Sequence, residues 1–161
     1  MTLHVTREQT FGAAVLPLLL VLLCMPLGVE AAVPIVMNQH DISSWQDVER
    51  IPPLSPIRRA REAVLWGDPK VGDHGILNEW GSNIRSGWQT RASDTRIVVV
   101  RGTLVVNIEG QRDREIDAGG FAFMPRGVKH NFGCTGMGRC TFMLYQSGPA
   151  GIQAAAPPAR R

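Results

Sequence analysis

Residues 119–132 read GGFAFMPRGVKHNF, and this stretch decides the fold. Two short apolar runs flank a Pro-x-Gly sequence at 125–127, which is typical of a tight turn between two strands. Side chains two residues apart on a strand point to the same face, so His130 shares a face with Phe132. Because Phe132 suits a protein interior, we expect His130 to point inward too. An inward histidine is either a satisfied core residue or a ligand, and the stretch itself leaves both open.

The chain on either side of this stretch has the pattern of an all-β protein. Short runs rich in β-branched and aromatic residues alternate with glycine-rich turns, and no long segment has the period of a helix. This pattern predicts an antiparallel sandwich or barrel. The expected strands are Ala63–Trp66, Gly75–Trp80, Ile84–Thr90, Arg96–Val100, Thr103–Ile108, Phe121–Met124, Lys129–Phe132 and Arg139–Gln146.

The N-terminus has the features of a secretory signal peptide. Arg7 precedes a long uncharged apolar stretch, which ends in small residues near Ala31. The alternative is an uncleaved membrane anchor, but Pro17 and Pro26 within the stretch favour cleavage. We therefore expect an exported chain, either periplasmic or secreted, that has no membrane contact after cleavage.

The expected organisation places one domain between two irregular segments. Prolines at 34, 52, 53 and 56 disfavour regular elements before the strands, although a short helical turn could form within Asp41–Asp47. After Ile152 the chain has no large apolar residue, so we expect a solvated tail. The predicted boundaries are a signal peptide at 1–31, an irregular arm at 32–62, a β-barrel at 63–152 and a flexible tail at 153–161.

The charge of the mature chain does not favour a nucleic-acid partner. Without Arg7, Glu8 and Glu30 the chain keeps 16 of its 17 basic and 12 of its 14 acidic side chains, a net charge of about +4. These charges are scattered, and the arginine cluster at 58–61 has no interleaved aromatic residues. We therefore expect no binding to nucleic acid.

Two cysteines remain in the mature chain, Cys134 and Cys140. An even pair across an expected hairpin turn, in an oxidising compartment, predicts a disulfide. The alternative is a pair of reduced thiols on neighbouring strands.

The sequence resembles the cupin superfamily. The glycine, proline, glycine and histidine of the second cupin motif match Gly119, Pro125, Gly127 and His130, while the final asparagine of that motif falls on Cys134. Gly102 matches the glycine that ends the first motif. Two further signatures, at 65–69 and 148–152, extend the resemblance from Leu65 to Ile152. The resemblance implies a single double-stranded β-helix (jelly-roll) barrel with an interior pocket, and a homodimer formed through an edge of the sheet.

The resemblance also implies a metal site, but the residues at its positions are poor ligands. Counting back from Gly102, the two histidines of the first motif fall on Gln89 and Arg91, and its glutamate falls on Thr95. Only His130 is retained. A stable site needs three or four nitrogen, sulfur or carboxylate donors, and a guanidinium repels a cation. We therefore expect no cofactor, although iron, manganese, nickel or zinc held by His130 and unusual ligands remains an alternative.

Three other residues could rescue such a site in a different register. His74 lies in a turn, where we expect it to be solvated. Asp94 is expected to close a turn, and Glu79 to face outward in a salt bridge.

Without a metal, the interior pocket would be polar and positively charged. Gln89 and Arg91 are two residues apart on one expected strand, so both side chains would face the cavity with His130. A guanidinium binds a carboxylate through two hydrogen bonds. Our hypothesis is a small anionic ligand, such as a carboxylate, bound by Gln89, Arg91, Thr95 and His130. The alternative is that Arg91 extends to the barrel mouth while Gln89 packs.

The class of function therefore stays open between three possibilities. The first is this metal-free binding protein. The second is a metal-dependent cupin enzyme of the dioxygenase or isomerase type. The third is a partner-binding module like the cupin halves of anti-sigma factors, which export and the missing ligands disfavour.

Overall fold

We describe the fold from a computed structural model, which describes residues 34–48 and 60–159. Contacts divide the chain into the units Met1–Ile35 and Val36–Arg161, and the second unit carries the fold. The expected signal peptide at 1–31 lies outside the described residues. Within those residues, no helix is long and apolar enough to cross a membrane.

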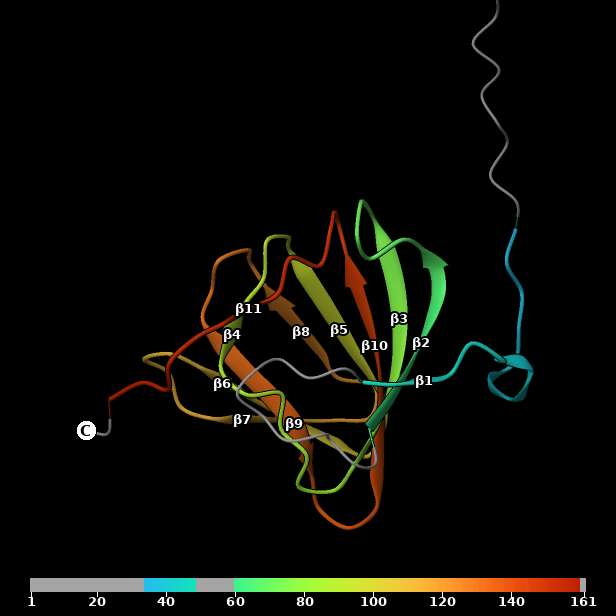
Figure 1. Cartoon of the computed structure of the whole chain (residues 1–161). Helices are drawn as coiled ribbons and strands as arrows, with labels where there is room; N and C mark the ends of the chain where they lie inside the picture. Colours follow the sequence, from blue (N-terminus) through green and yellow to red (C-terminus); the bar gives the residue numbers. More distant parts are fainter. Residues whose placement is uncertain (1–33, 49–59, 160–161) are drawn as a thin grey trace, which may run out of the picture. The chain divides into compact units, whose positions relative to one another are not determined.

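Two antiparallel sheets form the domain (Figure 1). The first sheet has the order β1 (Gln46–Asp47), β2 (Ala60–Gly67), β3 (His74–Gly81), β10 (Arg139–Gln146), β5 (Thr95–Arg101) and β8 (Phe121–Met124). The second has the order β11 (Gln153–Ala154), β4 (Gln89–Thr90), β9 (His130–Thr135), β6 (Thr103–Ile108) and β7 (Arg114–Asp117). The only helix in the described part is a single 3₁₀ turn, Gln39–Asp41. The expectation of an all-β jelly roll is confirmed.

The strand predictions are accurate where apolar residues recur, and three of them match β6, β8 and β10 at both ends. The strand expected at 84–90 is wrong over most of its length, because only Gln89–Thr90 is a strand. Asn83 and Gly87 both have positive φ, which turns the backbone away from an extended path at these points. The strand β7 was not expected, since its polar sequence at 114–117 has no apolar alternation.

The chain on either side of the barrel also differs from expectation. The helical turn ends at Asp41, and the residues that follow include the strand β1, which pairs with β2. In the tail, Gln153 and Ala154 pair with Thr90 and Gln89 of β4. These two residues therefore belong to a strand, although a flexible tail was expected from residue 153. Backbone hydrogen bonds to a sheet edge need no large apolar side chain, which is why the composition of the tail did not indicate the strand.

The core lies between the two sheets and is centred on aromatic rings. Trp80 stacks on Phe132 at 5.4 Å between ring centroids, and Phe142 meets both rings edge-on. The His130 ring lies parallel to Phe132 at 5.9 Å. Aliphatic residues from both sheets complete this core: Ile97, Val99, Leu104, Val106, Met124 and Leu144.

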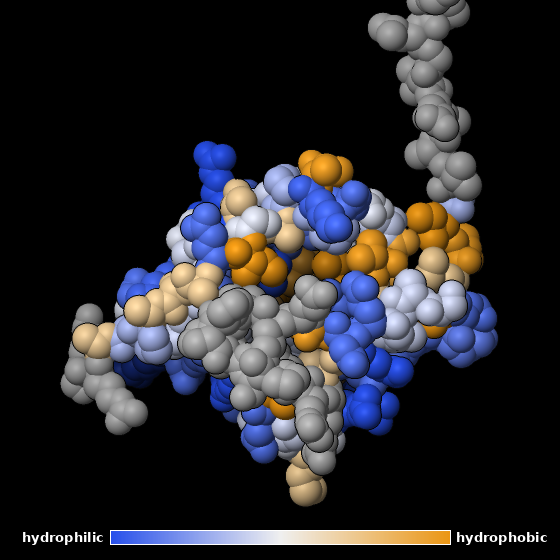
Figure 2. All heavy atoms as spheres, viewed as in Figure 1, coloured by the Kyte–Doolittle hydropathy of each residue, from blue (hydrophilic) through white to orange (hydrophobic). Residues whose placement is uncertain are grey.

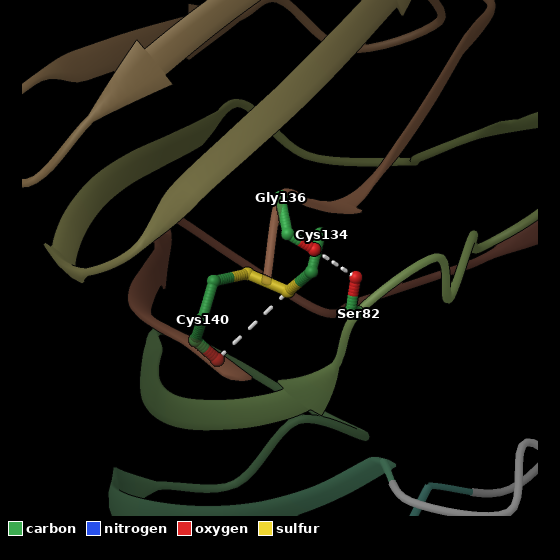
Figure 3. The surroundings of a disulfide bond; sticks show 4 residues. All are labelled: Ser82, Cys134, Gly136 and Cys140. Carbon is green, nitrogen blue, oxygen red and sulfur yellow. Dashed lines mark hydrogen bonds between the residues drawn. A yellow bond between two sulfur atoms is a disulfide. The ribbon is translucent and has the colours of Figure 1, made fainter. Parts of the chain in front are cut away.

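A disulfide joins Cys134 of β9 to Cys140 of β10 (Figure 3), as the sequence predicts. Both cysteines are buried, and their Cα atoms are 5.6 Å apart. The turn between them is not a hairpin, because β9 and β10 belong to different sheets. The disulfide therefore ties the two sheets together at one end of the barrel.

The same end requires a glycine at Gly102, which connects β5 of the first sheet to β6 of the second. Its φ is +74°, and a Cβ there would lie 2.8 Å from the carbonyl oxygen of Arg139. Any other residue would be strained and would collide with the neighbouring backbone.

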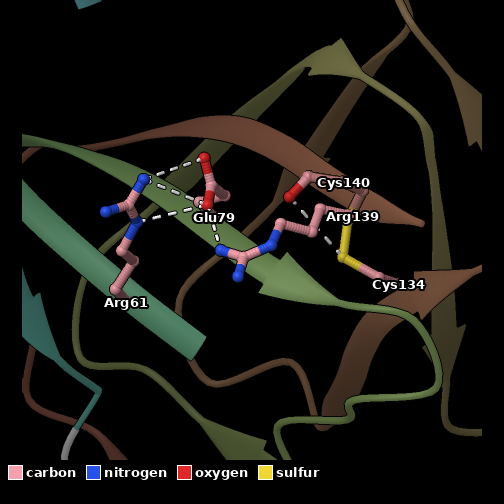
Figure 4. A network of polar contacts seen from close by, with 5 residues as sticks. All are labelled: Arg61, Glu79, Cys134, Arg139 and Cys140. Atoms are coloured by element: carbon pink, nitrogen blue, oxygen red, sulfur yellow. Dashed lines mark hydrogen bonds and ion pairs between the residues drawn. A yellow bond between two sulfur atoms is a disulfide. The ribbon is translucent and has the colours of Figure 1, made fainter. Parts of the chain in front are cut away.

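Glu79 lies on the outer side of β3 in an ion-pair network with Arg61 and Arg139 (Figure 4). Arg61 donates two hydrogen bonds to its carboxylate, at 3.2 and 3.3 Å. Burial alone would raise the pKa of Glu79, but the hydrogen bonds and charges of the two arginines outweigh burial and lower it. The expectation of an outward, salt-bridged glutamate is confirmed, and Glu79 is not available as a metal ligand.

We predict that reducing the Cys134–Cys140 disulfide lowers the free energy of unfolding. The closed ring is short, so the expected loss is about 2–3 kcal/mol. Urea unfolding with and without reductant measures it, and the double variant Cys134→Ala/Cys140→Ala, which reductant cannot change, is the control. Equal unfolding midpoints for the oxidised and reduced wild-type protein would contradict the prediction.

A buried polar layer above a cavity

Polar side chains form two rows at the barrel end opposite the disulfide. In the first sheet, His74, Gln146 and Thr95 lie side by side on β3, β10 and β5. In the second sheet, Gln89 of β4 lies directly opposite His130 of β9. All five side chains are buried. The sheets therefore enclose a polar layer, which lies at the upper ends of the strands in Figure 1.

Arg91 connects the two rows. It follows β4, yet its Nη1 donates a hydrogen bond of 2.7 Å to Oε1 of Gln146 in the other sheet. Its guanidinium lies over the Phe132 ring at 5.8 Å, and the residue is only 8% exposed. Burial lowers the pKa of Arg91 to about 10, an effect that attraction to Glu62 partly offsets. Arg91 thus remains a cation at neutral pH and points inward rather than to the barrel mouth.

His130 is held as a neutral imidazole within this layer. Its Nδ1 donates a hydrogen bond of 2.8 Å to the carbonyl oxygen of Val128, which leaves Nε2 as an acceptor. Burial lowers the pKa of His130 to about 4; the bond to Val128 opposes this shift, and the charge of Arg91 adds to it. His130 can therefore accept a hydrogen bond but carries no charge at neutral pH.

Several buried polar atoms of this layer have no hydrogen-bond partner within the described chain. They are both amide atoms of Gln89, Nε of Arg91, Nε2 of Gln146 and Nε2 of His74 and His130. A buried polar atom without a partner costs about 1–3 kcal/mol. The layer therefore carries an energetic cost that hydrogen bonds to these atoms would remove.

A cavity of about 660 Å³ lies against this layer. Gln89 and Arg91 contribute to its lining, together with the apolar side chains of Val64, Ile76, Trp80, Phe132 and Leu144. Val48 after β1 and three residues of the C-terminal segment, Ala150, Ile152 and Ala154, also line it. In the view of Figure 2, hydrophobic residues gather around a hollow, with hydrophilic residues beside them.

The four site residues expected from the sequence divide into two pairs. Gln89 and Arg91 line the cavity, as their shared parity predicts. His130 and Thr95 are not part of its lining, and the Thr95 hydroxyl donates to the carbonyl oxygen of Ser93 at 3.3 Å. Only two of the four side chains therefore border the cavity.

Two residues of the layer, His74 and Gln146, were not expected in it. The prediction of a solvated His74 is wrong: the residue is 0% exposed, and its Nδ1 donates to the carbonyl oxygen of Gly72 at 2.9 Å. His74 begins β3, on the same face as the cavity-lining Ile76. His74 is two residues from the inward-facing Ile76, so the alternation of side chains along a strand could have placed it inside. The same alternation relates Gln146 to the buried Leu144.

The donor set of this layer does not fit the divalent metal that the resemblance implies. His74 and His130 are its only imidazoles, and the cation Arg91 lies among them. Asp94 accepts a hydrogen bond from the backbone nitrogen of Arg126 at 2.9 Å, so its carboxylate joins two segments that are distant in the sequence. Nowhere in residues 34–48 and 60–159 do three histidine, cysteine, aspartate or glutamate residues form a group that could hold a metal ion.

Comparison with known proteins identifies the fold. No protein-family model and no curated protein matches the sequence. Among solved structures, the polyketide cyclase RemF from Streptomyces resistomycificus has 16% identity over 78% of this chain and 88% of its own, with a TM-score of 0.63. A cupin-like protein from Thermotoga maritima has 16% identity over 55% of this chain and 68% of its own, with a TM-score of 0.51.

A third structure, the DMSP lyase DddQ from Ruegeria pomeroyi, has 14% identity and a TM-score of 0.55. The match covers 63% of this chain and about half (54%) of that protein. These likenesses, together with the two antiparallel sheets, show that the chain has the cupin fold. At such low identity they show the fold alone.

We predict that His130 makes stability depend on pH. Its pKa is about 4 in the folded state and near 6.5 in the unfolded state, so the unfolded chain binds more protons between these values. The free energy of unfolding should therefore fall as the pH drops from 6.5 to 4, by about 3 kcal/mol in total. Urea unfolding across this range measures it, while NMR follows the titration of His130.

Two variants separate this effect from general acid denaturation. His130→Gln should lose this part of the pH dependence, whereas His40→Gln, at an exposed position, should retain it. A His130 resonance that titrates near pH 6.5 would disprove the prediction.

Proposed function

We propose that this cupin domain binds a small organic anion in its interior cavity, with Arg91 as the anion-binding group. The observation that carries this proposal is a buried guanidinium bordering a cavity of about 660 Å³. A ligand carboxylate beside Arg91 would accept charge-assisted hydrogen bonds in a region of low dielectric constant, where such bonds are strong.

The surroundings of Arg91 support this role. The bond to Gln146 fixes one end of the guanidinium, so little side-chain entropy remains to be lost when a ligand binds. Glu62 lines the same cavity and its charge attracts the guanidinium, so a bound anion would share Arg91 with this carboxylate. The amide of Gln89 lines the same cavity and offers a further donor.

The alternative is a metal-dependent enzyme with unusual ligands. One observation favours it: Nε2 of His130 and Nε2 of His74 are both buried acceptors without a partner. Two of the similar structures are described as a polyketide cyclase and a DMSP lyase, so the cupin fold serves enzymes as well. Metal analysis of the purified protein distinguishes the two, because near-stoichiometric metal that His130→Ala removes would contradict the metal-free proposal.

We predict that Arg91→Met abolishes the binding of organic acids. The variant keeps an apolar side chain of similar length but removes the charge and the hydrogen bonds, so the affinity should fall at least thirtyfold. Calorimetry and thermal shift with a panel of mono- and dicarboxylic acids measure the change. Arg114→Met, on the exposed face of β7, is the matched control and should bind like the wild type.

Two results would count against the proposal. One is that no acid in the panel raises the melting temperature of the wild-type protein. The other is that Arg91→Met and Arg114→Met bind the acids equally well. Arg91→Lys adds a further test, since it keeps the charge but loses the forked geometry and should bind with intermediate affinity.

We also propose that the protein is exported after cleavage near Ala31 or Ala32. The charged start, apolar middle and small-residue ending of residues 1–31 support this proposal, and a disulfide suits an oxidising compartment. N-terminal sequencing of the protein made from the full chain should find a start near Ala32. Recovery of the uncleaved chain in the membrane fraction would instead favour the anchor.

A further inference from the structure

We infer that the ligand is a monocarboxylate with an apolar body, rather than a hydrophilic acid or a dianion. This inference rests on the proposed function, since it describes the molecule that Arg91 would hold. It follows from how charge and apolar surface are distributed along the cavity wall.

The charged end of the cavity lies at the polar layer. Arg91 reaches from the second sheet to Gln146 of the first, and Gln89 borders the cavity from β4. Gln146 is the last residue of β10, so these groups mark the level at which that strand ends. A carboxylate held here would have its body directed along the strands toward the core.

The row of side chains next to this end is apolar, and the following row, Glu62 and Asn78, is polar and also lines the cavity. Val64, Ile76 and Leu144 lie side by side on β2, β3 and β10, and all three line the cavity. Leu144 is two residues from Gln146, which places the apolar row about 7 Å from the polar row. Phe132 lines the cavity from the second sheet. A ligand anchored at Arg91 would therefore place its body between aliphatic residues and an aromatic ring.

A second carboxylate would have no buried cation to meet it. Arg91 is the only buried cation lining the cavity within the described residues, and Lys70 in the lining is exposed. Glu62 and Asp68 also line the cavity, and their charges would repel a second carboxylate. Taking an ionised carboxylate out of water without a partner costs several kilocalories per mole. An apolar body, in contrast, gains free energy in proportion to the apolar surface that it buries.

The size of the cavity is consistent with this class of ligand. Its volume of about 660 Å³ lies within the range of roughly 300–1,000 Å³ that is typical of small-molecule sites. Acetate would leave most of this space unused.

A ligand series tests the inference directly. We would measure the affinities of acetate, hexanoate, 3-phenylpropionate, succinate and 3-phenylpropionamide by calorimetry. Each methylene buried on going from acetate to hexanoate should tighten binding by about fourfold. The acid 3-phenylpropionate should bind at least tenfold more tightly than succinate, and more tightly than its neutral amide, which lacks the charge.

A conservative variant of the apolar row adds a second readout. Val64→Thr replaces one methyl group by a hydroxyl with almost no change of shape, and should weaken hexanoate by about threefold or more while acetate is unchanged. Val98→Thr makes the same substitution on the outer face of the same sheet, where the residue is 43% exposed, and should have no effect.

The outcomes separate the inference from the proposed function. If succinate or acetate binds as tightly as 3-phenylpropionate, and Arg91→Met removes that binding, the anion site stands and the apolar-body inference is wrong. If no acid binds in a way that depends on Arg91, the proposed function fails and the inference fails with it.

Discussion

The hydrogen bond between Arg91 and Gln146 is the interaction on which the polar end of this domain depends. It crosses from one sheet to the other and holds a buried cation in a fixed position. The cation then affects its neighbours, because its charge helps to keep His130 neutral and it lies over the ring of Phe132. Without the amide oxygen of Gln146, the guanidinium would lose the partner that orients it.

The two ends of the barrel differ in the side chains that lie between the sheets. At one end, a disulfide and the tight turn at Gly102 bring the sheets together around aromatic residues, and Cys134 and Cys140 are buried. At the other end, the side chains between the sheets are polar, and several buried atoms have no partner within the described chain. The apolar end thus provides stability, while the polar end retains buried polar atoms whose hydrogen bonds the described chain does not satisfy.

The sequence predicts the strands and the inward-facing side chains of the site because side chains alternate between the two faces of a strand. Strands rich in β-branched and aromatic residues were placed correctly, and the parity of Gln89 and Arg91 directed both side chains to the cavity. The polar strand β7 carries no such signal. The buried position of His74 was not predicted, because the adjacent residues Gly72, Asp73 and Gly75 are typical of a turn and hid the fact that His74 lies two residues before Ile76 on the same strand. The contact between Arg91 and Gln146 spans 55 residues, and no local pattern indicates it.

Residues from both ends of the domain line the cavity. Val48 lies before the main strands, whereas Ala150, Ile152 and Ala154 follow the last long one. A chain that stops after Gln146 would therefore keep the long strands of both sheets but lose β11 and one wall of the cavity.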